Sequence, residues 1–166
     1  MQQGLITAEV LAVTTGLQSL ANWSVSRERP YGRDCDGPVL AGSRECLSNG
    51  RRYRSFFSGH TSQAFAAASA NCMHHGYVPL YGGGAADDWA CAAGLGIALG
   101  TGLLRMRTDV HYASDVAVGA VVGTAVGLGL PYFLHYRHGS ADDSGSSRYR
   151  LLVVPTGTGL SGLLVF

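Results

Sequence analysis

The stretch RMRTDVHYASD, residues 105–115, places two arginines, a histidine and two aspartates between hydrophobic segments. Arg105 lies six positions before His111, and Asp115 lies four positions after it. Residues four apart share one face of a helix, so we expect Asp115 beside the imidazole of His111. The hydrophobic segments around this stretch predict where its charge is placed in the fold.

Four hydrophobic segments cover 4–26, 61–73, 89–104 and 112–136. Each exceeds the usual strand length, and Ala, Leu and Met outnumber β-branched residues in most of them, which favours helices. The fourth segment is long enough to span a bilayer and the third is marginal. The sequence therefore predicts an all-α fold, an antiparallel helical bundle that is partly embedded in a membrane.

Glycines at 119, 123 and 127 recur every four residues in the fourth segment. They place a smooth stripe on one helix face, which allows close packing against a neighbouring helix. A membrane bundle and a soluble bundle would both use such a stripe, so it favours the membrane interpretation without deciding it.

A chain of 166 residues is long enough for one domain with a buried core. We expect a helical bundle over 1–136, a polar linker over 137–150 and a C-terminal β-hairpin of unknown role over 151–166, turning around 157–159. The start lacks the basic segment and cleavage site of a signal peptide. It enters a hydrophobic helix almost at once, which suits a version of a longer protein that lacks some N-terminal helices.

The charge composition argues against a general nucleic-acid-binding protein, because the net charge is only +1. All twelve basic residues are arginines, whose planar forks suit carboxylate or phosphate. Codon bias in a GC-rich genome would explain the arginines equally well.

Four cysteines permit three disulfide pairings. Cys35 and Cys46 lie in the polar loop 27–59 and would close a short ring if that loop faced an oxidising compartment; free thiols are the alternative. The stretch CMHH, residues 72–75, has no second ligand pair at zinc-like spacing. It is more typical of a helix end with exposed histidines.

Antiparallel packing of four sequential helices brings alternate helix ends together. The ends that share one side carry SRERP (26–30), SGH (58–60), LRMR (104–107) and DVHYASD (109–115). We therefore expect a polar pocket at one end of an apolar bundle, with the opening stretch as one of its walls.

The residue types at these ends suit an oxyanion. Arg29 and Arg105 are able to clamp it through paired charge-assisted hydrogen bonds. Ser58 and Gly59 precede a helix, whose free N–H groups and positive dipole end favour an anion.

Two histidines add the groups that phosphoryl transfer requires. Asp115 would hold one tautomer of His111 and stabilise its cation, leaving the other ring nitrogen free to attack. His60, on a different helix, is then available as a general acid for the leaving group. Taken singly, these features suit a surface ion pair and an ordinary helix cap. Together they predict phosphoryl transfer through a covalent phosphohistidine, with no metal required.

These motifs resemble the type 2 phosphatidic acid phosphatase (PAP2) superfamily, which includes bacterial acid phosphatases and vanadium haloperoxidases. Its pattern is Lys, six residues, then Arg-Pro; Ser-Gly-His; and Ser-Arg, five residues, His, three residues, Asp. The resemblance covers residues 15–135 and implies a bacterial membrane-associated phosphatase, a phosphoric ester hydrolase without a cofactor. Its substrate would be a lipid phosphate, an isoprenyl pyrophosphate or a small phosphate ester. The implied roles are nucleophile for His111, orienting partner for Asp115, proton donor for His60, and phosphate cradle for Arg29, Ser58, Gly59 and Arg105.

The chain departs from this pattern at two positions. Asn22 stands where the family has Lys, and Leu104 stands where it has the Ser before the third motif. Losing one charged hydrogen bond to phosphate costs about 1.5 to 3 kcal/mol. A different substrate charge, or Arg27 or Arg33 reaching into the site, would offset part of that loss.

Two other functions use the same pocket. A vanadate-dependent haloperoxidase would bind vanadate as a phosphate mimic, and a catalytically degenerate membrane bundle would only bind an anion. The resemblance also implies a site that faces the periplasm or another extracytoplasmic side. Seven of the twelve arginines lie in 27–59, on the site side, which the positive-inside rule would assign to the cytoplasm. We expect the outward orientation, because phosphate binding needs several of these arginines and long loops cross despite their charge.

Overall fold

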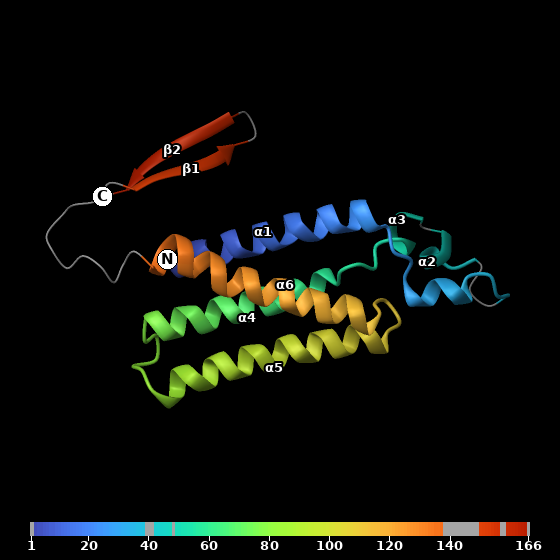
Figure 1. Cartoon of the computed structure of the whole chain (residues 1–166), viewed down its shortest axis with the longest axis horizontal. Helices are drawn as coiled ribbons and strands as arrows, with labels where there is room; N and C mark the ends of the chain where they lie inside the picture. The colour runs from blue at the N-terminus through green and yellow to red at the C-terminus, as the bar shows by residue number, and fades with distance from the viewer. Residues whose placement is uncertain (1, 39–41, 48, 138–149, 157–158, 166) are drawn as a thin grey trace, which may run out of the picture.

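The computed structural model describes residues 2–38, 42–47, 49–137, 150–156 and 159–165. Four long helices form the body of the molecule and lie side by side along its length (Figure 1). The predicted all-α helical bundle is confirmed. Its long helices are α1 (Gln2–Val25), α4 (Gly59–Tyr77), α5 (Ala85–Arg107) and α6 (Ala113–Pro131).

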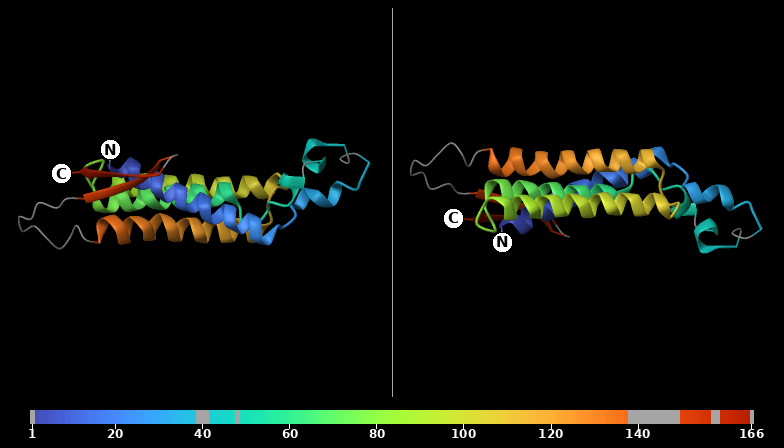
Figure 2. Two further views of the ribbon diagram at one scale, coloured as in Figure 1. Left: turned by 90° about the horizontal axis from the view of Figure 1, so that it is seen from above. Right: turned by 90° about the horizontal axis from the view of Figure 1, so that it is seen from below.

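The loop between α1 and α4 contains three short helical segments: η1 (Pro30–Asp34), α2 (Arg44–Leu47) and α3 (Asn49–Arg52). Both views in Figure 2 show this loop extending beyond one end of the bundle. At the opposite end, α6 continues beyond Pro131 as a turn of π-helix, η2 (Tyr132–Tyr136).

The second and third helices are longer than the hydrophobic segments 61–73 and 89–104 predict, because polar residues extend both of them. Asp87 lies in the first turn of α5, where the helix dipole favours negative charge. Its carboxylate pairs with His75 in the last turn of α4. A partner distant in sequence therefore allows polar residues to continue each helix.

The histidines of the CMHH stretch are buried, so the expected exposed histidines are wrong. His75 is paired with Asp87, and His74 lies between two hydroxyl groups. Its Nδ1 is 2.7 Å from the Tyr136 hydroxyl, and its Nε2 is 3.0 Å from the Thr7 hydroxyl. These bonds connect α4 to α1, α5 and η2 at the end of the bundle opposite the long loop.

Helix α4 lies against α1, α5 and α6. The glycine stripe of α6 faces it, as the sequence predicts: a Cβ added at Gly123 or Gly127 would collide with the backbone carbonyl of Ser62 or Ala66. Small residues on both helices therefore let their backbones approach closely.

Two disulfides are present. Cys35 and Cys46 form a disulfide, which decides between the two alternatives that the sequence allowed, a disulfide or free thiols. Cys72–Cys91 links α4 to α5 and was not predicted. One bond lies in the long loop and the other lies near the opposite end of the bundle.

Three segments are long and apolar enough to cross a membrane: 2–34, 85–107 and 113–136. Large apolar side chains on these helices point outward, including Ile97 at 71% exposed and Val121 at 69% exposed. Outward apolar side chains on helices of this length support a membrane protein.

Beyond the bundle, β1 (Arg150–Thr156) and β2 (Gly159–Val165) pair antiparallel, with Arg150 opposite Val165. The centre of the predicted hairpin turn, 157–158, lies outside the described residues. The predicted polar linker over 137–150 lies almost entirely outside them as well.

Candidate active site

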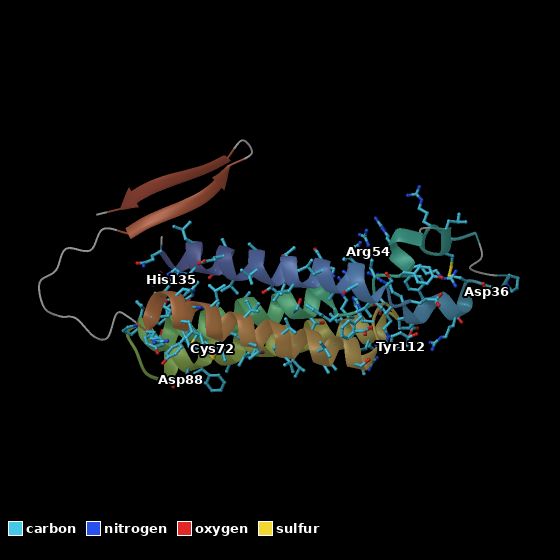
Figure 3. The ribbon with its side chains drawn as sticks, turned by 45° about the horizontal axis from the view of Figure 1, so that its top comes forward. Asp36, Arg54, Cys72, Asp88, Tyr112 and His135 are labelled. Carbon is cyan, nitrogen blue, oxygen red and sulfur yellow. A yellow bond between two sulfur atoms is a disulfide. The ribbon has the colours of Figure 1, made fainter. Side chains whose placement is uncertain are left out.

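The helix ends that the sequence places on one side do meet there. In Figure 3, Arg54 and Tyr112 lie at this end of the bundle, whereas Cys72, Asp88 and His135 lie at the other. A cavity of about 660 Å³ opens here, between the end of α1, the long loop, the start of α4 and the turn before α6. This cavity is the candidate active site.

Four of the predicted site residues line the cavity: Arg29, Gly59, His60 and His111. They come from three separate motifs of the sequence. Gly59 is the first residue of α4, and its lack of a side chain matters here, because an added Cβ would lie 3.0 Å from Cδ of Gln18.

The other three predicted residues, Ser58, Arg105 and Asp115, do not line the cavity. Ser58 caps α4: its hydroxyl accepts a hydrogen bond from the backbone N–H of Thr61 at 3.4 Å and lies 2.8 Å from the Thr61 hydroxyl. Arg105 is in the last turn of α5, near enough for its charge to act on both histidines of the cavity.

His111 lies in the turn between α5 and α6, before the first residue of α6. This turn reverses the chain with Asp109 in the left-handed region at φ 52°. The His111 Nδ1 is 2.7 Å from the backbone carbonyl oxygen of Ser55. A carbonyl only accepts, so Nδ1 carries the proton and Nε2 is left with its lone pair.

Burial lowers the pKa of His111 from 6.5 to about 4. The charges of Arg29 and Arg105 act in the same direction, and the Ser55 carbonyl and Asp115 act against it. The imidazole is therefore neutral at ordinary pH, which is the form that a nucleophile requires.

Asp115 is fully buried but does not hold His111 in the way the sequence predicts. Its Oδ2 is 3.9 Å from His111 Nδ1, which is beyond hydrogen-bond distance. The four-residue rule applies within a helix, and His111 precedes α6. The carboxylate instead accepts hydrogen bonds from the Ser55 hydroxyl at 2.5 Å, the Arg27 guanidinium at 2.7 Å and the Tyr112 backbone N–H at 3.1 Å.

Ser55 belongs to this network and was not identified by the sequence motifs. Ser55 is fully buried, and it connects Asp115 to His111 by bonding the first through its hydroxyl and the second through its carbonyl. Arg27, one of two arginines considered as a partial replacement for the missing lysine, pairs with Asp115 and lies 4.2 Å over the Tyr112 ring. Arg33, the other candidate, pairs with Asp109 at 3.4 Å.

His60, in the first turn of α4, lines the cavity. Its pKa lies below 6.5, first because of partial burial and then because of the nearby charges of Arg105 and Arg29. An anion bound between these arginines would oppose their effect and favour the protonated imidazole.

Two polar atoms in the cavity wall are buried and have no hydrogen-bond partner among the described residues: Arg29 Nε and Asn22 Oδ1. The Arg29 backbone is fixed by a bond from its N–H to the Arg52 carbonyl oxygen at 2.8 Å. An oxyanion in the cavity would satisfy the free donor of Arg29.

The arrangement places a neutral imidazole, a second histidine and an arginine around one cavity at the end of a membrane bundle. These are the groups that phosphoryl transfer to a histidine needs. Among the residues that the structure describes, no three His, Cys, Asp or Glu side chains are grouped to hold a metal ion.

Two comparisons relate this chain to known proteins, one to a curated relative and one to a family model. A curated relative, the lipid A 1-phosphatase of Porphyromonas gingivalis, is 39% identical over 79 residues. That stretch covers 48% of this chain but only 16% of the relative, so the chain spans a small part of that protein's length. The model of the PAP2 superfamily matches residues 3–139. The chain therefore belongs to the PAP2 superfamily, which confirms the resemblance found in its sequence. No solved structure matches the chain.

Proposed function

We propose that this chain is a phosphatase that removes the phosphate from a lipid phosphate ester through a phosphohistidine on His111. One observation carries the proposal: the neutral His111 keeps its Nδ1 on the Ser55 carbonyl and lines the same cavity as Arg29 and His60. The family match and the phosphatase relative support the reaction class.

The first chemical step would be attack by Nε2 of His111 on phosphorus. The N–P bond forms while the bond from phosphorus to the ester oxygen breaks. His60, protonated, gives its proton to the departing alkoxide, and the lipid leaves as an alcohol. Arg29 and the first N–H groups of α4, next to Gly59, would hold the phosphoryl oxygens.

The second step would hydrolyse the phosphohistidine. His60, now neutral, accepts a proton from water as the oxygen attacks phosphorus. The N–P bond breaks, phosphate is released, and both histidines return to their starting states. Each proton that His60 gives in the first step is therefore recovered in the second.

The buried network of Arg27, Asp115 and Ser55 would position His111 through both steps. Attack by Nε2 leaves positive charge on the imidazole, and the Ser55 carbonyl at Nδ1 stabilises that charge. Asp115, held by Arg27, keeps Ser55 in place and adds its negative charge at 3.9 Å. These residues act on the reaction through His111.

We propose that the site faces the periplasm. The Cys35–Cys46 disulfide is part of the long loop on the site side, and disulfides persist in oxidising compartments. The arginines of this loop oppose that orientation under the positive-inside rule, but several of them have internal partners, such as Arg52 on Glu28 at 2.5 Å.

Phosphate release in detergent with excess EDTA tests the function. Wild type should release phosphate from phosphatidic acid and from an aryl phosphate, and His111→Ala should not. His135→Ala is the matched control, because His135 lies at the other end of the bundle, bonded to Glu9. Background release from wild type, with phosphate still bound, would indicate the anion-binding bundle instead of an enzyme.

A further inference from the structure

The α1 wall of the cavity differs from the rest of the site because its polar side chains are uncharged. The charged and titratable groups elsewhere in the cavity come from Arg29, Tyr53, Arg54, His60 and His111. The α1 side instead presents amide and hydroxyl groups, joined by an amide from α4. These residues are Gln18, Ser19, Asn22 and Ser26, with Gln63 from α4.

This neutral wall interrupts a segment that is apolar enough to cross a membrane. Polar side chains in such a helix cost free energy unless they find partners or serve a site. Gln63 has a partner, since its amide donates to the Thr15 hydroxyl at 3.1 Å. Gln18 packs against Gly59.

Asn22 is different, because its buried Oδ1 has no donor among the residues that the structure describes. An unsatisfied buried acceptor is costly, so a bound ligand that donates a hydrogen bond here gains affinity. A phosphate monoester that has lost both protons has only acceptor oxygens, so in its dianionic form the phosphate held by Arg29 does not supply that donor. It has to come from the group to which the phosphate is attached.

We propose that Asn22 selects phosphate-monoester lipids that carry an N–H or O–H on the carbon next to the phosphate-bearing carbon. Asn22 lines the same cavity as Arg29 and His111, so we place this donor near the phosphate. This inference rests on the proposed function and names the substrate class of the same site. A lysine at this position would donate to the phosphate of any substrate, whereas the asparagine oxygen recognises only those with a neighbouring donor.

Ceramide 1-phosphate and phosphatidic acid form a matched pair of substrates. Both are two-chain phosphate monoesters, and the carbon next to the phosphate-bearing carbon carries an amide N–H in the first and an ester oxygen in the second. We would measure kcat/KM for both in the same mixed micelles, at a pH at which the phosphate is a dianion. Wild type should prefer ceramide 1-phosphate by at least about tenfold, since the ester leaves the buried acceptor unpaired.

Two substitutions at Asn22 should change this preference in distinct ways. Asn22→Leu should lower the ratio to near one by slowing ceramide 1-phosphate alone. Asn22→Lys should lower it by accelerating phosphatidic acid, because the new ammonium group donates to any phosphate. Ser24→Ala is the control: Ser24 is exposed, bonds only its own helix backbone, and should keep the wild-type ratio.

The outcomes separate this inference from the proposed function. Hydrolysis of both lipids at similar rates, unchanged in the Asn22 variants, would overturn the selection by Asn22 and leave the phosphatase intact. If wild type hydrolysed neither lipid, the proposed function would fail. Equilibrium binding of the same two lipids would then decide: a preference lost in Asn22→Leu supports the inference, and equal binding overturns it.

Discussion

At the scale of the residue, the state of His111 is set by two features. Burial keeps the imidazole neutral, and the Ser55 carbonyl holds the proton on Nδ1. Neither depends on a direct bond to Asp115, which lies 3.9 Å away. The tautomer that leaves Nε2 free is therefore fixed by a backbone oxygen.

The two histidines predict an acidic optimum for kcat/KM. His111 must be unprotonated, so activity should rise as the pH passes its pKa of about 4. His60 must be protonated, so activity should fall as the pH rises through its pKa, which lies below 6.5 in the free enzyme. A pH profile with phosphatidic acid, whose alkoxide leaving group needs the proton of His60, measures both limbs. An alkaline optimum, or a falling limb that survives in His60→Ala, would contradict these roles.

Ser55→Ala should lower kcat while leaving KM nearly unchanged. The substitution removes the hydroxyl that bonds Asp115 but keeps the carbonyl that holds His111. Since Ser55 does not line the cavity, substrate binding should persist. Loss of this hydrogen bond to the buried Asp115 carboxylate costs about 1 to 3 kcal/mol. We therefore expect about a tenfold loss of kcat. Steady-state kinetics and the acid limb of the pH profile check this.

A rise in KM at constant kcat would show that Ser55 contributes to binding instead. Ser24→Ala, an exposed serine on α1, serves as the control for loss of a hydroxyl.

The sequence predicted part of this residue-level arrangement. The motif spacings placed Arg29, His60 and His111 together, and the cavity contains all three. They could not reveal the carbonyl of Ser55, because a backbone atom has no residue signature. They also did not indicate that Arg27 pairs with Asp115, because that contact depends on how the long loop folds.

At the scale of the element, the contact between α4 and α6 positions the two histidines relative to each other. His60 lies in the first turn of α4, and His111 precedes α6. The glycine face of α6 lies on the backbone of α4, and the fully buried Ala66 forms part of that contact. The distance between these helices therefore controls the width of the site.

Gly123→Ala should destabilise the bundle by about 1 to 3 kcal/mol, because its Cβ would meet the Ser62 carbonyl. Gly100→Ala on α5 is the matched control, since nothing lies within 4 Å of its added Cβ and alanine favours a helix. Thermal unfolding in detergent measures both. Equal midpoints for the two variants would show that α4 and α6 do not pack through this glycine.

Helix existence was predictable from the sequence, whereas helix length was not. Apolar runs identified all four long helices, but α4 and α5 extend beyond their runs at both ends. His75 near the end of α4 and Asp87 near the start of α5 pair with each other. This pair allows both helices to continue through polar residues. Such pairing between helices is invisible to local periodicity.

At the scale of the whole molecule, topology brings the catalytic motifs together, although more than 80 residues separate Arg29 from His111. Antiparallel packing of sequential helices was enough to predict this convergence from segment lengths. The disulfide between Cys72 and Cys91 was not predictable, because it depends on which faces of α4 and α5 meet.

The disulfide in the site-side loop gives a direct test of orientation. In spheroplasts, a membrane-impermeant reductant followed by an impermeant maleimide should label Cys35 and Cys46, because an outward site exposes this loop to the medium. Mass spectrometry identifies the labelled residues. Labelling that requires lysis of the inner membrane would place the site on the cytoplasmic side.

The central claim is a covalent phosphate on His111, and trapping that intermediate tests it most directly. In His60→Ala, an aryl phosphate has a leaving group good enough to phosphorylate the enzyme, but the water step lacks its base, so the phosphoenzyme should accumulate. Mass spectrometry after rapid quenching should locate an acid-labile phosphate on His111, and none in the His60→Ala/His111→Ala double variant. Label on another residue, or none while wild type releases phosphate, would contradict the account.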